Sequence, residues 1–241
     1  MIEPPARNCM WRFCYGAPQN FDDSELFCGG IKAQWQDNCG RCGVCGDNFS
    51  DPPPRRHETG NEYARNITVR TYEPGSNVDI VVDIVANHLG YFEFALCPRD
   101  DFSVAETEEC FDSHPLEVMG DGKEEADSAS RYRIKNATNG IYLTRVMLPP
   151  DITCTSCVLR WHWRSGNNWG QCADGTEALG CGPQETYRNC ADIAIRNGQG
   201  VRGLVGANAL VKAEVLPIRD PEWGPLPSNA LDDSQDGQEG M

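Results

Sequence analysis

Apolar and polar residues alternate with a period close to two in several short runs of the chain after residue 65. Three of them are rich in β-branched and aromatic residues: 65–73, 77–87 and 91–97. In the third, Phe92, Phe94 and Leu96 share one face, as in a strand that buries one side. Four later runs are similar: 141–148, 157–164, 190–195 and 210–218. Short strands with irregular connections and no long amphipathic helix predict an all-β fold, an antiparallel β-sandwich.

The segments between these runs are predicted to be loops. Residues 1–60 are rich in Cys, Gly, Pro and Asn and show little periodicity, which indicates long loops held by cross-links. Residues 99–135 are polar and charged, which predicts loops with a short helix, and PGSN at 74–77 predicts a turn. From residue 217 the chain is Pro-rich and then acidic. We therefore expect one β-sandwich domain over 1–216 and a disordered linker or tail over 217–241.

The overall charge excludes some classes of partner. The 241 residues include 36 acidic and 21 basic side chains, which gives a net charge of −15. Such a chain is not expected to bind nucleic acid or anionic membranes. The longest apolar stretch, 78–86, is interrupted by Asp79 and Asp83 and is too short to span a membrane.

Thirteen cysteines place the chain in an oxidising compartment, so we expect a secreted, extracellular protein. Cys154-x-x-Cys157 and the Cys39, Cys42, Cys45 cluster could in principle hold zinc. Their separation of over one hundred residues favours disulfides instead. An odd number leaves at least one thiol unpaired, and Cys14 is the candidate. Sequons at three asparagines predict N-glycosylation: Asn48, Asn66 and Asn136.

The chain begins with MIEPPAR, which lacks the apolar region of a signal peptide. We therefore expect residues of the mature protein to precede Met1. Motifs for serine hydrolases, P-loop enzymes and dinucleotide binding are lacking in the sequence.

Among the four histidines, His88 is the candidate metal ligand, because it directly follows a predicted strand and precedes a Leu-Gly turn. His162 lies in a Trp-flanked strand and is expected to be structural. His57 and His114 lie in polar segments and are expected to be solvated.

Several long blocks resemble the AA15 family of lytic polysaccharide monooxygenases and occur in that family's order over roughly residues 2–195. The blocks are IEPPARNCMWR, ELFCGG, CGRCGVCGD, ANHLGYFEFALCP, CVLRWHWRSGNNWG and GCGPQETYRNCADI. The resemblance implies an immunoglobulin- or fibronectin-like β-sandwich with an exposed copper site. It also implies a reaction in which copper, an external electron donor and O₂ or H₂O₂ cleave chitin or cellulose oxidatively, by removing a hydrogen beside a glycosidic bond.

The resemblance also implies which residues form the site. His88 supplies one copper nitrogen, and Tyr187 occupies the axial position. Two further nitrogens come from a first histidine, which we expect about three residues upstream of Met1. Ala86 lies close to the other axial face, and Arg160 and Gln184 lie near the metal without binding it. Three nitrogens and an oxygen suit copper.

A flat polysaccharide needs a flat, exposed surface, and the turn at Asn167, Asn168 and Trp169 is the candidate substrate surface. Phe27 and Trp35 are expected instead to pack a small core in the first loop region. Neither chitin nor cellulose is selected by these residues, although an acidic protein is expected to repel polyuronates. The protein is expected to be a monomer.

Two alternative functions remain open at this point, because Met1 cannot replace the expected first histidine. One is a polysaccharide-binding module of the same fold that has no catalytic activity. The other is a structural extracellular protein cross-linked by its cysteines.

Overall fold

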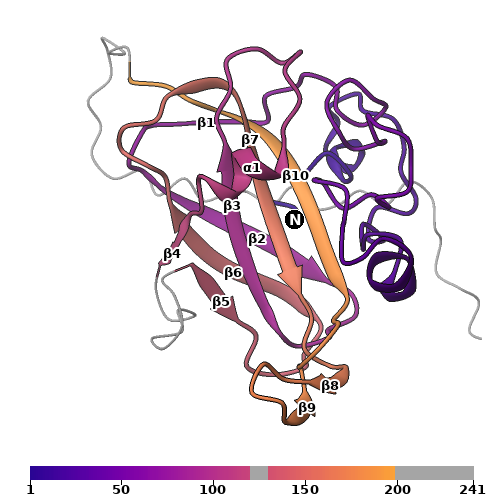
Figure 1. The fold of residues 1–241 in the computed structure, drawn as a ribbon. Coiled ribbons are helices and arrows are strands. Elements are labelled where there is room, and N and C mark those ends of the chain that lie inside the picture. The colour runs from indigo at the N-terminus through magenta and orange to yellow at the C-terminus, as the bar shows by residue number, and fades with distance from the viewer. Residues whose placement is uncertain (120–129, 199–241) are drawn as a thin grey trace, which may run out of the picture. The chain divides into compact units, whose positions relative to one another are not determined.

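Two packed β-sheets form the body of the protein in a computed structural model that describes residues 1–119 and 130–198. The larger sheet has five strands, in the order β1 (Arg70–Tyr72), β10 (Thr186–Ile195), β7 (Cys154–Arg164), β3 (Tyr91–Cys97) and β5 (Arg131–Arg133). The smaller sheet has the order β2 (Asn77–Ile84), β6 (Gly140–Met147) and β4 (Glu117–Met119). A separate hairpin of β8 (Trp169–Gln171) and β9 (Glu177–Leu179) lies at one end of the sheets (Figure 1).

Hydrophobic alternation explains how the sheets face each other. In β2, Val78, Ile80, Val82 and Ile84 are buried, whereas Asp79 and Asp83 between them are exposed. In β7, Leu159, Trp161 and Trp163 enter the core between the sheets. Val158 on the opposite face is buried as well, because it packs in a second cluster with Phe111 and the Cys45 and Cys190 sulfurs. The expected all-β sandwich is confirmed.

The predicted strands at 77–87 and 91–97 contain β2 and β3, and those at 141–148, 157–164 and 190–195 overlap β6, β7 and β10, which begin earlier in the chain. Within the predicted run 65–73, only Arg70–Tyr72 forms a strand, and β1 pairs in parallel with β10, contrary to the expected antiparallel sheet. Sequence patterning missed β4, β5, β8 and β9, because each has only three residues. The predicted strand 210–218 and the predicted tail 217–241 lie outside the described residues.

The helical elements are short. They are η1 (Met10–Phe13), η2 (Ala33–Asp37) and α1 (Glu108–Asp112). Helix α1 is the short helix expected within 99–135, and its N-cap Thr107 accepts a hydrogen bond from the Cys110 amide. Most of residues 1–69 are loops and turns that run beside the sheets (indigo to purple in Figure 1). No helix in the described ranges is long and apolar enough to cross a membrane.

Five disulfides cross-link the described residues, as expected, and two of them hold the loops of residues 1–69. The five are Cys28–Cys42, Cys45–Cys190, Cys97–Cys110, Cys154–Cys157 and Cys172–Cys181. The C-x-x-C cysteines that could have held zinc are therefore used in bridges, except Cys39. Three thiols stay free, the buried Cys9 and the exposed Cys14 and Cys39, so the expectation for Cys14 is confirmed.

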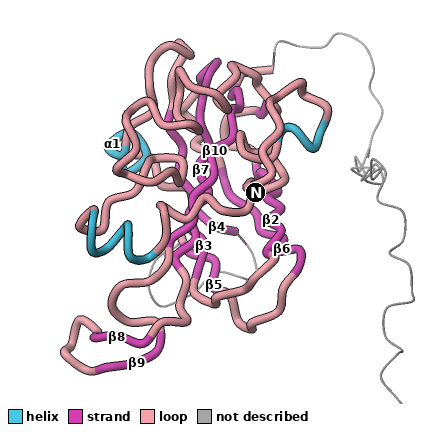
Figure 2. The backbone as a smooth tube through the Cα atoms, turned by 90° about the vertical axis from the view of Figure 1, so that its right-hand side faces the viewer, coloured by secondary structure: helices cyan, strands magenta, loops and turns pink. Residues whose placement is uncertain are grey.

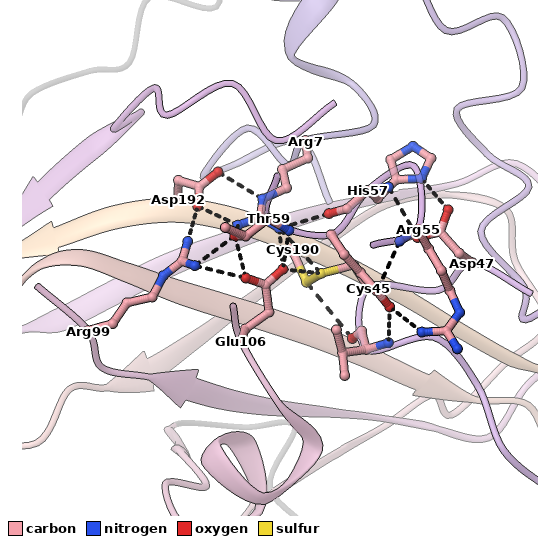
Figure 3. A network of polar contacts seen from close by, with 12 residues as sticks. Arg7, Cys45, Asp47, Arg55, His57, Thr59, Arg99, Glu106, Cys190 and Asp192 are labelled. Carbon is pink, nitrogen blue, oxygen red and sulfur yellow. Dashed lines mark hydrogen bonds and ion pairs between the residues drawn. A yellow bond between two sulfur atoms is a disulfide. The ribbon is translucent and has the colours of Figure 1, made fainter. Parts of the chain in front are cut away.

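A buried polar network ties the first loops to β10 (Figure 3). Arg7 donates to Asp192 at 2.6 and 2.8 Å and to Glu106 at 2.5 Å. Arg99 reaches the same two carboxylates at 3.2 and 2.9 Å. Two guanidinium groups therefore balance two carboxylates in the interior, which makes burial of the four charges tolerable.

The expectation that His57 is solvated is wrong. His57 is 5% exposed, stacks on Tyr63 and places Nδ1 at 2.8 Å from Asp47 Oδ1, as Figure 3 shows for the aspartate. Its polar sequence neighbours suggested a surface loop, but Asn20, Asp47 and Tyr63 surround its ring in the folded chain. His114 is half-buried, with Nδ1 2.8 Å from the carbonyl oxygen of Cys110.

Candidate metal centre

The backbone around His88 is fixed by hydrogen bonds to the end of β7. The Gly166 amide donates to the His88 carbonyl at 2.8 Å, and the Trp163 indole N–H donates to the Leu89 carbonyl at 2.7 Å. Leu89 and Gly90 have φ of 56° and 84°. A Cβ at Gly90 would lie 2.0 Å from the Arg164 carbonyl oxygen, so only glycine allows this close approach.

Asn87 closes the turn from the other side. Its Oδ1 accepts from the Leu89 amide at 2.7 Å, and its Nδ2 donates to the Tyr142 hydroxyl at 2.6 Å and the Thr138 carbonyl at 2.9 Å. This side chain links the His88 turn to the loop that precedes β6. The segment between β2 and β3 therefore presents His88 on a rigid support.

The His88 imidazole lies at an accessible point with its side chain 28% exposed. The ring is nearly parallel to that of Trp163, with centroids 5.8 Å apart. Its Nδ1 lies 3.1 Å from Asn167 Nδ2, and its Nε2 lies 3.7 Å from Glu185 Oε2. The two ring nitrogens thus face different partners.

Tyr187 approaches the same point from β10. Its ring stacks on Trp163 with centroids 4.8 Å apart and lies 6.3 Å from the His88 ring. Its hydroxyl donates to Glu185 Oε2 at 2.8 Å. Burial, followed by the hydrogen bond and negative charge of Glu185, raises the pKa of Tyr187. The phenol therefore keeps its proton at neutral pH.

Glu185 is a residue of this site that sequence reasoning missed. Its side chain is 23% exposed and stands next to both His88 and Tyr187. The signal was present in the chain, because residues 185 and 187 are two apart at the start of a strand and so point to the same face. Placing that face next to His88 needed the tertiary structure.

The first residues pair with the neighbouring edge of the smaller sheet. The Ile2 amide donates to the Val81 carbonyl oxygen at 2.8 Å, and Glu3 forms an antiparallel bridge with Val81. Met1 is buried, and its backbone nitrogen donates to Asn189 Oδ1 at 2.6 Å. Asn189 and Tyr187 lie two residues apart on the core-facing side of β10.

The structure gathers most of the other predicted residues near His88. Ala86 is exposed in the segment that leads to His88. Gln184 is fully buried, and its amide bonds both the N–H and the carbonyl of Asn168 at 3.0 Å. Trp169, which is 67% exposed, begins the β8–β9 hairpin beside Asn167 and Asn168.

Arg160, in contrast, lies on the outer face of the larger sheet, away from the core-facing Trp163 and Tyr187. It pairs with Glu108 at 2.9 Å and stacks over Phe111. Burial and the nearby Arg188 charge lower its pKa to about 10. No described contact joins it to His88.

Phe27 and Trp35 do not form a separate small core as expected. Phe27 stacks on Tyr187 with centroids 6.0 Å apart, and the Trp35 indole N–H donates to the Gln184 carbonyl at 2.8 Å. The first loop region therefore supports the residues around His88.

The donor types at this point fit copper, which accepts imidazole nitrogen and oxygen ligands. Within the ranges that the structure describes, no group of three or more His, Cys, Asp or Glu residues could hold a metal ion. One imidazole and one phenol are fewer donors than the three nitrogens expected from the sequence. The described residues thus offer only part of the donor set that a copper site needs.

Comparisons of the whole chain with known proteins identify its family. The family described as "Lytic polysaccharide mono-oxygenase, cellulose-degrading" matches residues 1–193. A structure of "Lytic Polysaccharide Monooxygenase AA15 from Thermobia domestica in the Cu(I) State" is 48% identical, with a TM-score of 0.75, and the match covers 80% of this chain and 96% of that chain.

Two other solved structures are more distant. A "cellulose active LPMO CelS2 (ScLPMO10C) in complex with Copper" is 13% identical with a TM-score of 0.40, over 82% of this chain and 98% of that one. Fusolin from Anomala cuprea entomopoxvirus is 14% identical with a TM-score of 0.37, over 74% and 67%. These two likenesses are too weak to indicate function. No curated protein sequence is significantly similar to the chain. The family match and the 48% identical structure show that the chain belongs to the AA15 lytic polysaccharide monooxygenases and that its cofactor is copper.

Proposed function

We propose that this copper monooxygenase is secreted and oxidises chitin or cellulose, with copper held by His88, Tyr187 and a histidine that precedes Met1. The observation that carries the proposal is the direction in which the chain enters the structure. Met1 approaches along the edge of β2, and β2 leads directly to His88.

The pairing register makes this direction specific. Glu3 faces Val81, and in an antiparallel pair a step back along one strand matches a step forward along the other. If the register of this single bridge continued, Met1 would be level with Asp83, and a residue three positions before Met1 would be level with Ala86. Three residues extend roughly 10 Å. A histidine there would lie next to the His88 turn, where its amino group and imidazole would join the His88 nitrogen.

The residues around the metal have separate tasks in this proposal. His88 would supply an imidazole nitrogen to copper, and Tyr187 would offer a neutral phenol, because burial and Glu185 raise its pKa. Trp163 stacks against both rings and fixes their planes. Bound copper supplies the one-electron chemistry that activates O₂ or H₂O₂, with electrons from an external donor.

The substrate surface of the proposal is the turn at Asn167 and Asn168 with the exposed indole of Trp169. The hairpin that carries Trp169 is cross-linked by Cys172–Cys181, so its exposed ring is held on a rigid support. Figure 2 shows the hairpin projecting from the end of the sheets. An aromatic face of this kind can pack on the apolar face of a pyranose ring.

Five disulfides support secretion, because such bridges persist in oxidising compartments. The predicted glycosylation sites differ in their surroundings. Asn66 and Asn136 are exposed, whereas Asn48 is partly buried and its Oδ1 accepts from Asn38 Nδ2 and the Ser50 amide, both at 3.0 Å. All three remain predictions, which peptide mapping of the secreted protein would test.

His88→Ala tests the proposal in the mature secreted protein, with His114→Ala as the matched control at a histidine outside the site. Calorimetric titration with Cu(II) should show one tight site in the parent and the control and none in His88→Ala. Circular dichroism should be unchanged, because the His88 side chain is partly exposed. Only the parent and the control should release oxidised fragments from chitin or cellulose.

Two outcomes would contradict the proposal. One is unchanged copper affinity in His88→Ala. The other is a mature amino terminus, read by sequencing, that is not histidine. In the second case, binding of polysaccharide without oxidation would become the supported function.

A further inference from the structure

Asn167 is the polar side chain that contacts Nδ1 of the His88 ring. Its Nδ2 lies 3.1 Å from His88 Nδ1, while His88 Nε2 on the other side of the ring lies 3.7 Å from the Glu185 carboxylate. Asn167 is exposed and was expected only to face substrate. The contact gives it a second task, at the metal ligand itself.

The backbone on both sides of Asn167 is fixed. Before it, the Gly166 amide donates to the His88 carbonyl at 2.8 Å, and a Cβ at Gly166 would lie 3.0 Å from the Gly90 nitrogen. After it, the buried Gln184 bonds the N–H and the carbonyl of Asn168. The Asn167 side chain is therefore held beside the ring although it is exposed.

The observed contact selects one tautomer of His88. A neutral imidazole has one N–H donor and one acceptor nitrogen, and an amide NH₂ group can only donate. When Asn167 Nδ2 faces Nδ1, that nitrogen accepts and the proton is on Nε2, directed at Glu185. In this state neither nitrogen is available to a metal, because Nε2 carries a proton and Nδ1 is occupied.

Copper at Nε2 requires the opposite arrangement. Nε2 must be unprotonated, so the proton lies on Nδ1, and a metal-bound histidine usually donates this N–H to an acceptor. Asn167 supplies that acceptor when its amide rotates by 180° and presents Oδ1. The imidazole stays neutral, because the proton lost from Nε2 is matched by one taken up at Nδ1 through exchange with water.

We propose that Asn167 is a positioning residue whose amide reverses when copper binds, so that His88 changes from the Nε2–H to the Nδ1–H tautomer. The proposal rests on the proposed function, in which His88 is a copper ligand. An asparagine can stabilise both tautomers, whereas an aspartate accepts only and favours the metal-binding one.

Three variants of the mature protein separate this role from a structural one. Asn167→Leu removes both hydrogen-bonding groups, and Asn167→Asp keeps only the acceptor. Asn168→Asp is the matched control, because it adds the same charge at the next residue while its backbone contacts to Gln184 remain. We expect Cu(II) affinity to fall about 10- to 100-fold in Asn167→Leu. Asn167→Asp should bind more tightly than both the parent and Asn168→Asp.

A second measurement uses the metal-free chain and needs no copper. Nitrogen NMR of ¹⁵N-histidine-labelled protein, recorded at about pH 8, above the usual pKa of a histidine, reports which His88 nitrogen carries the proton. The parent and Asn168→Asp should show the proton on Nε2, and Asn167→Asp should show it on Nδ1. His88→Ala assigns the signal.

Either of two results would overturn the inference. In the first, Asn167→Leu binds Cu(II) as tightly as the parent. In the second, Asn167→Asp has the same His88 tautomer as Asn168→Asp. Failure of the proposed function is recognised separately, because His88→Ala would then leave copper affinity unchanged whatever tautomer the NMR spectrum shows.

Discussion

Strand β10 carries two polar clusters that differ in almost every physical respect. Around Asp192, the side chains of Arg7, Glu106 and Arg99 are at most 4% exposed, and every charge has a partner of opposite sign. Around Tyr187, five residues earlier, the side chains of His88 and Glu185 are 28% and 23% exposed. The first cluster is closed to solvent, and the second is open on one side.

The difference shows how one strand can both hold the fold together and bear a metal site. The charges of Asp192 and Glu106 raise the pKa of Arg7 despite its burial, so Arg7 keeps its positive charge inside the network. The network stabilises the fold only when all four residues are present, because a charge that loses its partner would be buried without compensation. The cluster at Tyr187 leaves donor atoms accessible, which a metal ligand requires. Changes in the first cluster should therefore affect stability, and changes in the second should affect copper binding.

The largest expected effect on the free energy of unfolding comes from Arg7→Met. Removal of the guanidinium leaves Asp192 and Glu106 with Arg99 alone, and breaking a buried ion pair costs about 3–5 kcal/mol. Urea unfolding would measure it. Lys32→Met is the control, because Lys32 and Asp37 form an exposed pair for which we expect no clear change. Equal stability of Arg7→Met and the parent would refute the anchoring role of the network.

Two disulfides, one beside the buried network and one in the hairpin near His88, allow the same two regions to be compared by their effect on the free energy of unfolding. Replacing Cys45 and Cys190 by Ser opens a loop of 145 residues beside the buried network, and we expect a loss of about 2–5 kcal/mol. Replacing Cys172 and Cys181 opens a loop of only 9 residues in the hairpin, for which about 3 kcal/mol is the upper value. Melting temperatures of the two double variants should differ in that order. A larger loss of stability from removal of the hairpin bridge would contradict the assignment of stability to the buried network and of copper binding to the region around Tyr187.

The smallest expected effect is the change in folding stability with pH that Glu106 causes. Burial alone would raise the pKa of Glu106, but the charge and hydrogen bond of Arg7, the Thr59 hydroxyl and the Arg99 charge together lower it. A carboxyl group with a lowered pKa stabilises the fold above the unfolded value of about 4.3, and this stability is lost as the pH falls below it. Unfolding measured from neutral to acidic pH should show this loss. The loss of stability at acidic pH should be smaller in Glu106→Gln than in the parent. An identical pH dependence in the two proteins would show that Glu106 does not cause this loss.

Much of the sandwich could be predicted from local patterns. The runs at 77–87 and 91–97 contain β2 and β3 because alternation fixes which side of a strand is apolar, independent of its partner. The three-residue strands β8 and β9 are too short to show a period, and β1 pairs in parallel through contacts that no local pattern records. Cysteine usage predicted disulfides, while the pairing of Cys45 with Cys190 depends on residues 145 positions apart.

The candidate site divides in the same way. The sequence by itself determined the longer strands, the oxidised cysteines and the blocks that contain His88 and Tyr187. Only the tertiary structure decided that Glu185 and Asn167 contact the two sides of the His88 ring, that His57 is buried and that Arg160 lies on the other face of the sheet. The physical reason is range: side-chain periodicity is set by neighbours along the chain, whereas hydrogen bonds and ring contacts depend on segments that meet only when the sheets pack.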